Sequence, residues 1–426
     1  MDIKIFPSQV SGTIIAPPSK SVTHRAIILA SLANGTSHLK NVLLSDDTKN
    51  TIEGLRSLGI IIEQKGNDLI VRGTGGKLTA PQKPIFLGNS GSSIRMLTAI
   101  AALANGTTTL TGEKRLCQRP IGDLLTALRY LGVNARSQEN NDCPPVIING
   151  GKLNGGTITI SGNISSQYIT ALLLIAPFAK KTMEINVDGK LKSKPYVALT
   201  IDLMKTFGVK VENNNFETFV VQNNQVYKSQ EYTVEGDYSS AAYFFAAGAI
   251  TKQIVTVRNL NTDSEQGDKR FVFLLEEMGC AVKQNADGFS VLRNKELNAI
   301  DVSMSNQPDT VQTLAVIAAF AKGNTKIRDI DHLRFKESDR ISTTIQELAK
   351  MGIQCSYKNK TLYIAGGKPN GAQIETHNDH RVAMSFAIAA LGAKGETVIQ
   401  NAEVVNKSYP NFFDDLQSVG AKIEKI

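Results

Sequence analysis

Two kinds of loop in this 426-residue chain collect side chains that could bind small anions. Loops of the first kind precede Ala-rich segments; they are Ser19-Lys20-Ser21, residues 88–93, Ser165-Ser166-Gln167, residues 237–240, Gln307-Pro308-Asp309 and residues 377–381. Loops of the second kind precede other helical segments; they include Arg119-Pro120, Ser193-Lys194-Pro195-Tyr196, residues 334–340 and Lys407-Ser408-Tyr409-Pro410. Both kinds are predicted to lead into helices, whose first N–H groups and positive end suit phosphate and carboxylate.

Capping is the alternative explanation of these loops. Serine, threonine, aspartate and asparagine are the usual N-caps of helices, so capping alone accounts for each loop taken singly. The cationic side chains need a further explanation, because a Lys or Arg in the first turn opposes the helix dipole. Such residues lie in or close to the predicted first turns; they are Lys20, Arg25, Arg95, Arg340 and Arg381. An anionic ligand would balance their charge.

Other chemistries lack their usual sequence patterns. Neither Gly-x-x-x-x-Gly-Lys-Ser/Thr nor Gly-x-Gly-x-x-Gly after a strand is present, so nucleotide binding of those kinds is not predicted. The five histidines have no metal-ligand spacing, and we interpret His377 and His380 as part of a solvated helix start. Ser166 and Ser193 lack the His and carboxylate setting of a nucleophile. The sequence therefore predicts no metal and no serine nucleophile.

The loops recur because the chain repeats one supersecondary unit. A leucine-containing helix end followed by glycine occurs six times, at Gly59, Gly132, Gly208, Gly279, Gly352 and Gly420. Successive glycines are 73, 76, 71, 73 and 68 residues apart, which indicates six copies of one unit. Glycine suits the end of a helix because it accepts the left-handed backbone conformation at low cost.

A second landmark divides the chain into domains. An Ala-rich helix followed by a small turn and a short strand recurs in register with the glycines. Each unit then alternates strands with helices, which is typical of an α/β protein. Six units divide naturally into two domains of three. We place the crossings near Ser19 and Glu235, which predicts a domain of residues 19–235 and another of residues 1–18 plus 236–426.

Composition narrows the class of protein. The 47 Lys plus Arg exceed the 39 Asp plus Glu, and this net charge of +8 favours an acidic partner or substrate. The four scattered cysteines form no Cys-x-x-Cys pair, which argues against a disulfide framework and fits a reducing compartment. No apolar signal core or apolar run of about 20 residues is found. We therefore expect a cytoplasmic protein.

The loop motifs, taken in order, resemble those of the enolpyruvyl transferase family, and specifically its 5-enolpyruvylshikimate-3-phosphate synthases. The resemblance covers nearly the whole chain. It rests on Lys20-Ser21 with Arg25, residues 88–91, Arg119-Pro120-Ile121, Ser165-Ser166-Gln167, Ser193-Lys194-Pro195-Tyr196, residues 336–340, residues 379–385 and Lys407-Ser408-Tyr409-Pro410. One such motif could arise by chance, whereas eight in the same order could not plausibly do so.

The resemblance implies a fold and an activity. It implies two inside-out α/β domains, each of three βαβαββ units, with the active site in the cleft between the domains. The implied reaction transfers the enolpyruvyl group of phosphoenolpyruvate to the 5-hydroxyl of shikimate 3-phosphate and releases phosphate, a step of aromatic amino acid biosynthesis. The implied partners are these small molecules alone, without nucleic acid, membrane, metal or organic cofactor, and the protein is expected to be a monomer.

The resemblance also implies roles for individual residues. The residues expected around shikimate 3-phosphate are Lys20, Ser21, Arg25, Ser165, Ser166, Gln167, Ser193, Asp309, His332 and Lys336. The residues expected around phosphoenolpyruvate are Lys20, Gly91, Arg119, Gln167, Arg340, Arg381 and Lys407. Asp309 would deprotonate the acceptor hydroxyl, and Glu337 with Lys20 would handle the proton at the methylene carbon. His332 departs from the pattern, because many members carry an amide side chain there.

Two other functions compete with this interpretation. The related transferase that acts on UDP-N-acetylglucosamine resembles a chain with Lys-Asn at the opening and a loop cysteine five residues before an arginine. Here the opening is Lys20-Ser21, and Cys117 lies two residues before Arg119. A basic nucleic-acid-binding protein would account for the positive charge, but it predicts exposed aromatic residues interleaved with Lys and Arg. Aromatic residues make up 6% of this chain, and most lie in apolar segments.

Overall fold

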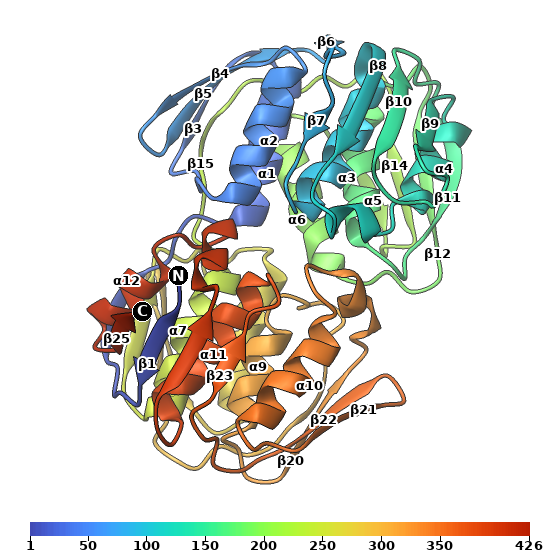
Figure 1. The fold of residues 1–426 in the computed structure, drawn as a ribbon. Helices are drawn as coiled ribbons and strands as arrows, with labels where there is room; N and C mark the ends of the chain where they lie inside the picture. The colour runs from blue at the N-terminus through green and yellow to red at the C-terminus, as the bar shows by residue number, and fades with distance from the viewer. The chain divides into compact units, whose positions relative to one another are not determined.

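The computed structural model describes residues 1–426, and the chain forms two compact units (Figure 1). Unit 1 comprises Met1–Pro17 and Glu235–Ile426, and unit 2 comprises Pro18–Val234. The chain thus passes between the units twice, one residue earlier at each crossing than the sequence analysis placed it. Each unit has its own apolar core.

Unit 2 consists of three four- to five-stranded sheets and six helices. The helices are α1 (Lys20–Leu32), α2 (Asp46–Ser57), α3 (Gly91–Ile100), α4 (Gly122–Tyr130), α5 (Ser166–Ile175) and α6 (Lys194–Thr206). The first sheet has the order β15-β3-β5-β4, with β3 (Asn34–Lys40), β4 (Ile61–Lys65), β5 (Asp68–Thr74) and β15 (Glu231–Thr233). The second contains β6 (Leu78–Thr79), β7 (Ile85–Phe86), β8 (Ala104–Thr111), β9 (Asn134–Ser137) and β10 (Val146–Gly150). The third has the order β11-β12-β14-β13, with β11 (Gly156–Ser161), β12 (Met183–Asp188), β13 (Glu212–Asn214) and β14 (Thr218–Val221).

Unit 1 repeats this plan with three four-stranded sheets and six helices. The helices are α7 (Tyr238–Thr251), α8 (Arg270–Glu277), α9 (Val311–Ala318), α10 (Arg340–Lys350), α11 (His380–Gly392) and α12 (Phe412–Ser418). The first sheet has the order β17-β18-β16-β2, with β2 (Gly12–Ile15), β16 (Val255–Arg258), β17 (Ala281–Asn285) and β18 (Gly288–Leu292). The second has the order β19-β20-β22-β21, with β19 (Asp301–Ser303), β20 (Asn324–Arg328), β21 (Cys355–Lys358) and β22 (Thr361–Ala365). The third has the order β23-β24-β1-β25, with β1 (Ile3–Phe6), β23 (Gln373–Glu375), β24 (Thr397–Gln400) and β25 (Lys422–Lys425).

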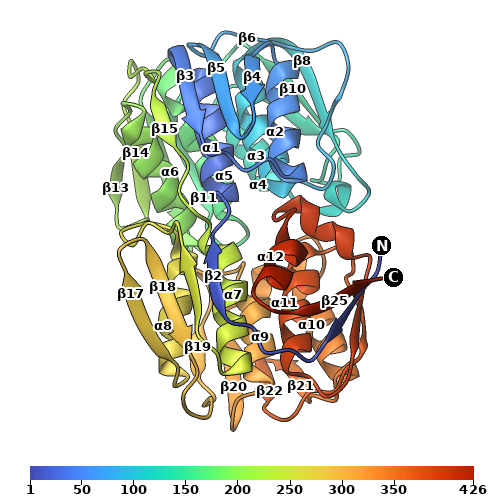
Figure 2. The same ribbon diagram turned by 90° about the vertical axis from the view of Figure 1, so that its left-hand side faces the viewer.

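All six sheets share one pairing scheme, a parallel pair extended by antiparallel strands, as in β11-β12-β14-β13. Strands distant in sequence complete three of them. β15 joins β3 in unit 2, and in unit 1 β2 joins β16 while β1 lies between β24 and β25. Figure 2 shows β1 beside the C-terminal strand β25. The N-terminal residues therefore belong to unit 1, because their backbone groups complete its sheets.

Helices occupy the centre of each unit and sheets the outside, which confirms the expected inside-out arrangement. The sequences of the central helices explain it. All 14 residues of α7 are buried, and in α1 only Ser21 is not. A helix that is apolar on every side must be surrounded by protein. The surface helix α10 has an apolar face and a polar face, as its position requires. No helix of the chain is both long and apolar enough to cross a membrane.

The repeated glycines end helices as predicted. Gly59, Gly132 and Gly208 follow α2, α4 and α6 with φ of 92°, 89° and 90°. The equivalent glycines after α8, α10 and α12 have φ of 104°, 80° and 107°. These values lie in the region that favours glycine, so the repeat rests on a backbone requirement.

One polar loop of unit 1 holds both crossing segments. The Asn259 amide donates to the carbonyl of Ala16 at 2.9 Å, on the first crossing. On the second crossing, the Glu235 carboxylate accepts hydrogen bonds from Ser264 at 2.5 Å and from Gln266 at 2.7 Å. The loop therefore fixes the positions at which the chain leaves and re-enters unit 1.

Replacement of Gly236 by a larger residue is expected to destabilise this arrangement. A Cβ atom at position 236 would lie 2.0 Å from the carbonyl oxygen of Asn259. Since that atom belongs to the backbone, Gly236→Ala should lower the free energy of unfolding by about 1–3 kcal/mol. Chemical denaturation measures the loss. Gly367→Ala is the matched control, because its Cβ would meet only the flexible end of Ile353 at 3.2 Å. Equal stability of the two variants would contradict this account.

Candidate functional site

The central helices of unit 2 begin with neutral caps. Ser19, Ser90 and Ser165 are the N-caps of α1, α3 and α5, and their side chains accept hydrogen bonds from backbone N–H groups of the first turn. No acidic residue lies in any of these three first turns. The positive helix ends are therefore not compensated from within the helices, and an anion is favoured there.

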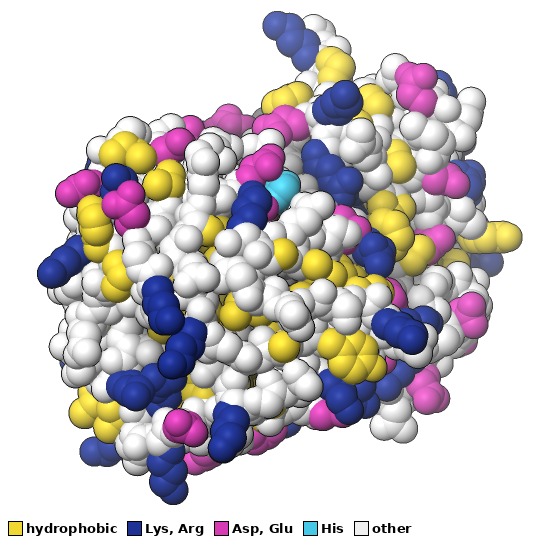
Figure 3. All heavy atoms as spheres, turned by 60° about the horizontal axis from the view of Figure 1, so that its bottom comes forward, with side chains coloured by type: hydrophobic (Ala, Val, Ile, Leu, Met, Phe, Trp, Pro, Cys, Tyr) yellow, Lys and Arg dark blue, Asp and Glu magenta, His cyan; other side chains and the backbone are white.

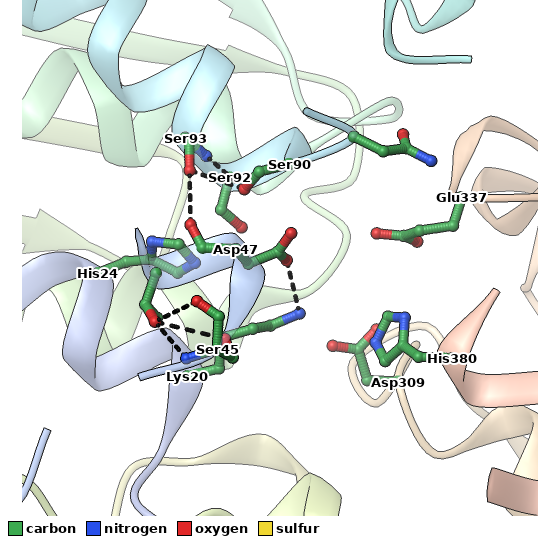
Figure 4. A network of polar contacts seen from close by, with 12 residues as sticks. Lys20, His24, Ser45, Asp47, Ser90, Ser92, Ser93, Asp309, Glu337 and His380 are labelled. Carbon is green, nitrogen blue, oxygen red and sulfur yellow. Dashed lines mark hydrogen bonds and ion pairs between the residues drawn. The ribbon is translucent and has the colours of Figure 1, made fainter. Parts of the chain in front are cut away.

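Lys20 is the first residue of α1 and is held by a residue that the sequence analysis did not select. Its Nζ lies 3.1 Å from Oδ2 of Asp47, and both side chains are nearly buried. The Ser93 hydroxyl donates to the carbonyl of Asp47 at 3.2 Å, which ties α2 to α3 (Figure 4). Asp47 therefore orients the side chain of Lys20.

Gly91 and Arg119 are brought together at the start of α3. Arg119 is 4% exposed, and its Nη1 donates to the carbonyl of Asn89 at 3.4 Å. A Cβ atom at position 91 would lie 2.3 Å from Nη2 of Arg119. Glycine at position 91 therefore allows the guanidinium group to lie against the first turn of α3, where both could bind one anion.

Gln167 is oriented by Arg95, which the sequence analysis noted only as a cation near a helix start. The Gln167 side-chain oxygen accepts from Arg95 Nη1 at 2.7 Å, and its Nε2 donates to the Ser92 hydroxyl at 2.9 Å. Arg95 also donates to the carbonyl of Pro120 at 3.3 Å. These contacts join α3, α5 and the loop before α4 in one network.

Arg25 faces inward. Its side chain donates to the carbonyls of Ser21 and Tyr196 and to the hydroxyls of Thr170 and Thr200, at 2.8 to 3.4 Å. Burial lowers the pKa of Arg25 to about 10. Four of its five N–H donors are engaged within unit 2, so Arg25 joins α1 to α5 and α6. The structure thus adds a structural role to the contact with substrate that the resemblance implies.

Ser193 has an unusual backbone conformation. It is the N-cap of α6, with φ of 56° and ψ of 41°, and it is 5% exposed. A non-glycine residue in the left-handed region costs roughly 1–3 kcal/mol and is found often at ligand sites. Ser165 and Ser166 lie at the start of α5 and are also buried, whereas Ser21 in α1 is partly exposed.

In unit 1, Arg340 forms the centre of an ionic cluster. Its Nε lies 2.8 Å from Asp379, its Nη2 lies 2.8 Å from Glu337, and its Nη1 lies 3.0 Å from Asp309. The Arg340 side chain is 1% exposed. Burial by itself would lower the pKa of Arg340, but the attraction of the three carboxylates outweighs it and raises the pKa. Arg340 therefore remains cationic and fixes the positions of all three acids.

Arg381 shares one carboxylate with Arg340. Its Nη2 lies 2.9 Å from Oδ2 of Asp309, while Arg340 binds Oδ1 of the same group. Arg381 also donates to the Tyr243 hydroxyl at 3.2 Å, and burial raises the pKa of Tyr243 to about 12. Two guanidinium groups thus converge on the two oxygens of a single carboxylate, an arrangement that suits carboxylate and phosphate generally.

The remaining expected residues of unit 1 differ in burial. His332 and Lys407 are 4% and 8% exposed, in the short helices η5 (Asp331–Phe335) and η6 (Ala402–Lys407), and Lys336 is partly buried. His380 is fully buried, and His377 lies 2.8 Å from the buried Glu347. The interpretation of His377 and His380 as a solvated helix start is therefore wrong, because a buried carboxylate and the packing of α11 enclose them.

Asp379, part of a motif in the sequence, was not selected as a site residue. It caps α11 by accepting from the N–H of Arg381, and it also binds Ser338 at 3.1 Å. The Asp379 carboxylate also pairs with Arg340, which is the first residue of α10. Asp379 thereby holds the starts of two helices together. The sequence did contain a signal for this role, because Asp379 is a predicted helix cap and Arg381 lies in the first turn of the same helix.

Asp268 is a buried carboxyl group in the loop before α8 that was not selected as a site residue. It lies in the short helix η4 (Gly267–Lys269) and accepts a hydrogen bond from the Ser239 hydroxyl of α7. Burial, followed by repulsion from Asp309, raises the pKa of Asp268 to about 7. Because this pKa exceeds that of the unfolded chain, the folded protein binds the proton more tightly and loses stability as the pH rises towards 7.

The stability of an Asp268→Asn variant should therefore depend less on pH. Asparagine can still accept from Ser239 but does not titrate. Between pH 5 and pH 8, the free energy of unfolding of the unsubstituted protein should fall by about 1–3 kcal/mol more than that of the variant. Urea denaturation at both pH values measures the difference. An equal fall in both proteins would show that Asp268 does not titrate in this range.

The chain is similar to known proteins in both sequence and fold. The family described as EPSP synthase (3-phosphoshikimate 1-carboxyvinyltransferase) matches residues 6–416. A 3-phosphoshikimate 1-carboxyvinyltransferase of Methanocaldococcus jannaschii is 42% identical over 420 residues, covering 98% of this chain and 97% of that protein. One from Methanococcus maripaludis is 40% identical over 423 residues, covering 98% of each. The structure of EPSP synthase from Acinetobacter baumannii aligns with a TM-score of 0.83 at 27% identity, over 100% of both chains. This chain therefore belongs to the EPSP synthase family.

Proposed function

We propose that this enzyme transfers the enolpyruvyl group of phosphoenolpyruvate to the 5-hydroxyl of shikimate 3-phosphate and releases inorganic phosphate. This is the activity named for its relatives, and it places the enzyme in the shikimate pathway of aromatic amino acid biosynthesis. The pairing of Arg340 and Arg381 on one carboxylate is the observation that carries the proposal. Phosphoenolpyruvate has a carboxylate of its own that this pair of guanidinium groups can bind.

Unit 1 would supply the acid and base of the addition step. The shikimate hydroxyl attacks C2 of phosphoenolpyruvate and loses its proton to the Asp309 carboxylate, while C3 gains a proton from Glu337 in its protonated carboxyl form. Asp309 accepts one hydrogen bond from each arginine on separate oxygens. Since a carboxylate has about four acceptor positions, Asp309 keeps capacity for the substrate hydroxyl. The product of this step is a tetrahedral adduct that carries the phosphate on C2.

The elimination step would reverse the role of Glu337. The C–O bond to phosphate breaks, C3 returns its proton to Glu337, and the double bond forms again on the transferred group. Lys20 would stabilise the departing phosphate and assist the proton transfer. Asp47, whose Oδ2 lies 3.1 Å from Nζ of Lys20, would hold this side chain in place. Arg119 beside Gly91, and Lys407, would hold the same phosphate by charge-assisted hydrogen bonds.

The starts of α1, α5 and α6 would bind shikimate 3-phosphate. Their hydroxyl groups and first N–H groups suit its phosphate and ring hydroxyls; the residues assigned are Ser21, Ser165, Ser166 and Ser193. Gln167 would contact both substrates, because Arg95 and Ser92 hold its amide in one orientation. Lys336 and His332 would complete the set, and Arg25 would act from within unit 2.

The proposal also covers the oligomeric state of the enzyme, its location and the classes of ligand that it does not bind. We infer a monomer in the cytoplasm that binds neither nucleic acid nor membrane and uses no metal or organic cofactor. The four cysteines are free thiols in the structure, which supports a reducing compartment. The positive net charge of +8 is explained by two highly anionic substrates.

Phosphate release from phosphoenolpyruvate tests the proposal directly. Shikimate 3-phosphate should support release, UDP-N-acetylglucosamine should not, and filter binding should detect no complex with DNA at physiological salt. Release with the UDP-sugar alone would instead assign the chain to the other enolpyruvyl transferase. DNA retention without release would favour a nucleic-acid-binding protein.

A further inference from the structure

Unit 1 contains a second cation-lined pocket at the opposite ends of its central helices. It has a volume of about 520 Å³ and is lined by Lys252, Arg293, Glu296, Leu297, Phe320, Ala321, Lys322, Gly323, Gly366, Gly367 and Lys368. Lys252 follows the C-terminal end of α7, and Phe320 follows that of α9, whereas Asp309 precedes α9. With about 1.5 Å per helical residue, α7 alone separates the pocket from its own N-terminal end by about 20 Å.

Positive charge dominates this pocket. Four basic side chains line it against one carboxylate, and none of the four forms a salt bridge or a hydrogen bond within the 426 described residues. The Nε atom of Arg293 is buried without a hydrogen-bond partner. Burial also lowers the pKa of Arg293, which reflects the cost of holding this charge in the wall. An unpaired buried donor is destabilising, and an anionic ligand would remove that cost.

Helix dipoles alone do not account for these lysines. A cation after a helix C-terminus is stabilising, which gives Lys252 and Lys322 a structural role. The same turn of the repeat in unit 2 holds Asn34 after α1, Asn105 after the segment that follows α3, and Lys180 after the segment that follows α5. Two of the three repeats of unit 2 thus have no cation at this turn, so the repeat itself does not require lysine. Arg293 and Lys368 lie on other loops and have no helix end to compensate.

The walls of the pocket are held in place by the backbone. Lys322 N–H donates to the carbonyl of Leu297 at 2.7 Å, and Gly366 N–H donates to that of Gly323 at 2.9 Å. These bonds join three loops that come from two repeats. Leu297 is 1% exposed and Phe320 is partly buried, so one wall is apolar. Figure 3, which brings this end of unit 1 forward, shows Lys and Arg side chains around an area of apolar and uncoloured atoms.

We propose that this pocket is a binding site for a small phosphorylated molecule with an apolar or ring portion, separate from the catalytic residues. Arg293, Lys252, Lys322 and Lys368 would bind the phosphate groups, and Phe320 with Leu297 would contact the ring. The volume falls within the usual range for small-molecule sites. Arginine and lysine together provide the planar and point-charge donors that phosphates require.

A tryptophan placed in the pocket makes the site directly observable, because the chain has no tryptophan. The fluorescence of a Phe320→Trp variant should change on titration with ADP and with pyrophosphate, at constant ionic strength. ADP should bind more tightly than pyrophosphate, since it adds a ring. In the same background, Arg293→Gln with Lys368→Gln should weaken the response by about tenfold or more. Lys358→Gln with Lys360→Gln removes two exposed charges outside the pocket and should leave the response unchanged.

The outcomes separate this site from the catalytic one. Phosphate release should be equal in all these variants, because none of the substituted residues belongs to the proposed catalytic set. If Phe320→Trp disturbs folding by circular dichroism, Asn294→Trp on the exposed surface beside Arg293 is the second reporter. No fluorescence change with either reporter would overturn the proposal, as would equal responses in the pocket and control variants. Equal affinity for ADP and pyrophosphate would overturn the assigned contact with Phe320.

Discussion

Glu337→Gln is expected to lose most turnover, by about 10²–10⁴-fold, while it still binds both substrates. Glutamine has nearly the same shape and can still accept a hydrogen bond from Arg340, whose Nη2 lies 2.8 Å from the Glu337 carboxylate. It cannot give or take the proton at C3. Incorporation of solvent deuterium into the enolpyruvyl methylene should therefore slow in parallel with turnover.

Asp309→Asn should also lose turnover, but with a different signature. Its carboxylate is the common partner of Arg340 and Arg381, so the amide should weaken shikimate 3-phosphate binding as well. Deuterium incorporation and ligand affinity are measured on both variants, with the exposed Glu424→Gln as a control that should match the unsubstituted enzyme. Deuterium incorporation at a normal rate in Glu337→Gln would eliminate Glu337 as the carbon acid and base, and would move that role to Lys20.

Arg119→Ala and Arg381→Ala should each reduce kcat/KM for phosphoenolpyruvate roughly 30- to 5,000-fold. This corresponds to a loss of about 2–5 kcal/mol of transition-state stabilisation. Both guanidinium groups are almost buried, so each should bind an anion with little screening by solvent. In Arg381→Ala, Asp309 keeps its contact with Arg340, and the fold should therefore persist. Arg381→Lys should give an intermediate loss, because an ammonium cannot reproduce the planar donor pair.

An exposed arginine provides the matched control for this series. Arg258 pairs with Asp287 at 3.0 Å, and its side chain is 56% exposed. Because exposed pairs contribute about 0–1 kcal/mol, Arg258→Ala should change neither kcat/KM nor the melting temperature appreciably. An unchanged kcat/KM in Arg119→Ala or Arg381→Ala would remove that residue from the phosphoenolpyruvate site. A collapsed melting temperature would instead assign the loss of activity to unfolding.

The sequence by itself determined the repeat and the class of fold. The six glycines mark helix ends because only a residue without a side chain takes φ near 90° at low cost, and that requirement is local. The buried helices were also legible, since their Ala-rich sequences have no polar face. Serine and aspartate caps with Lys or Arg close by marked the helix starts that are proposed to bind anions, for the same local reason.

Tertiary structure alone decided the partners of those residues. Asp309, Glu337 and Asp379 are far apart in sequence, yet one guanidinium group of Arg340 binds all three. The sequence showed Asp309 and Glu337 as separate candidates and did not single out Asp379, because spacing along the chain reports neighbours on one helix or strand only. The inward orientation of Arg25 and the pairing of Lys20 with Asp47 likewise depend on helices from different parts of the fold.

The strand pairing that completes the sheets of each unit was also decided by tertiary structure. β15 pairs with β3, and β1 lies between β24 and β25, so strands nearly 200 or 400 residues apart complete single sheets. Such a strand pairs with the sheet edge that remains open once the central helices are packed. No local pattern within a strand of four residues encodes this choice of partner. Local sequence therefore specified the elements and their ends, while packing of apolar helices selected their neighbours.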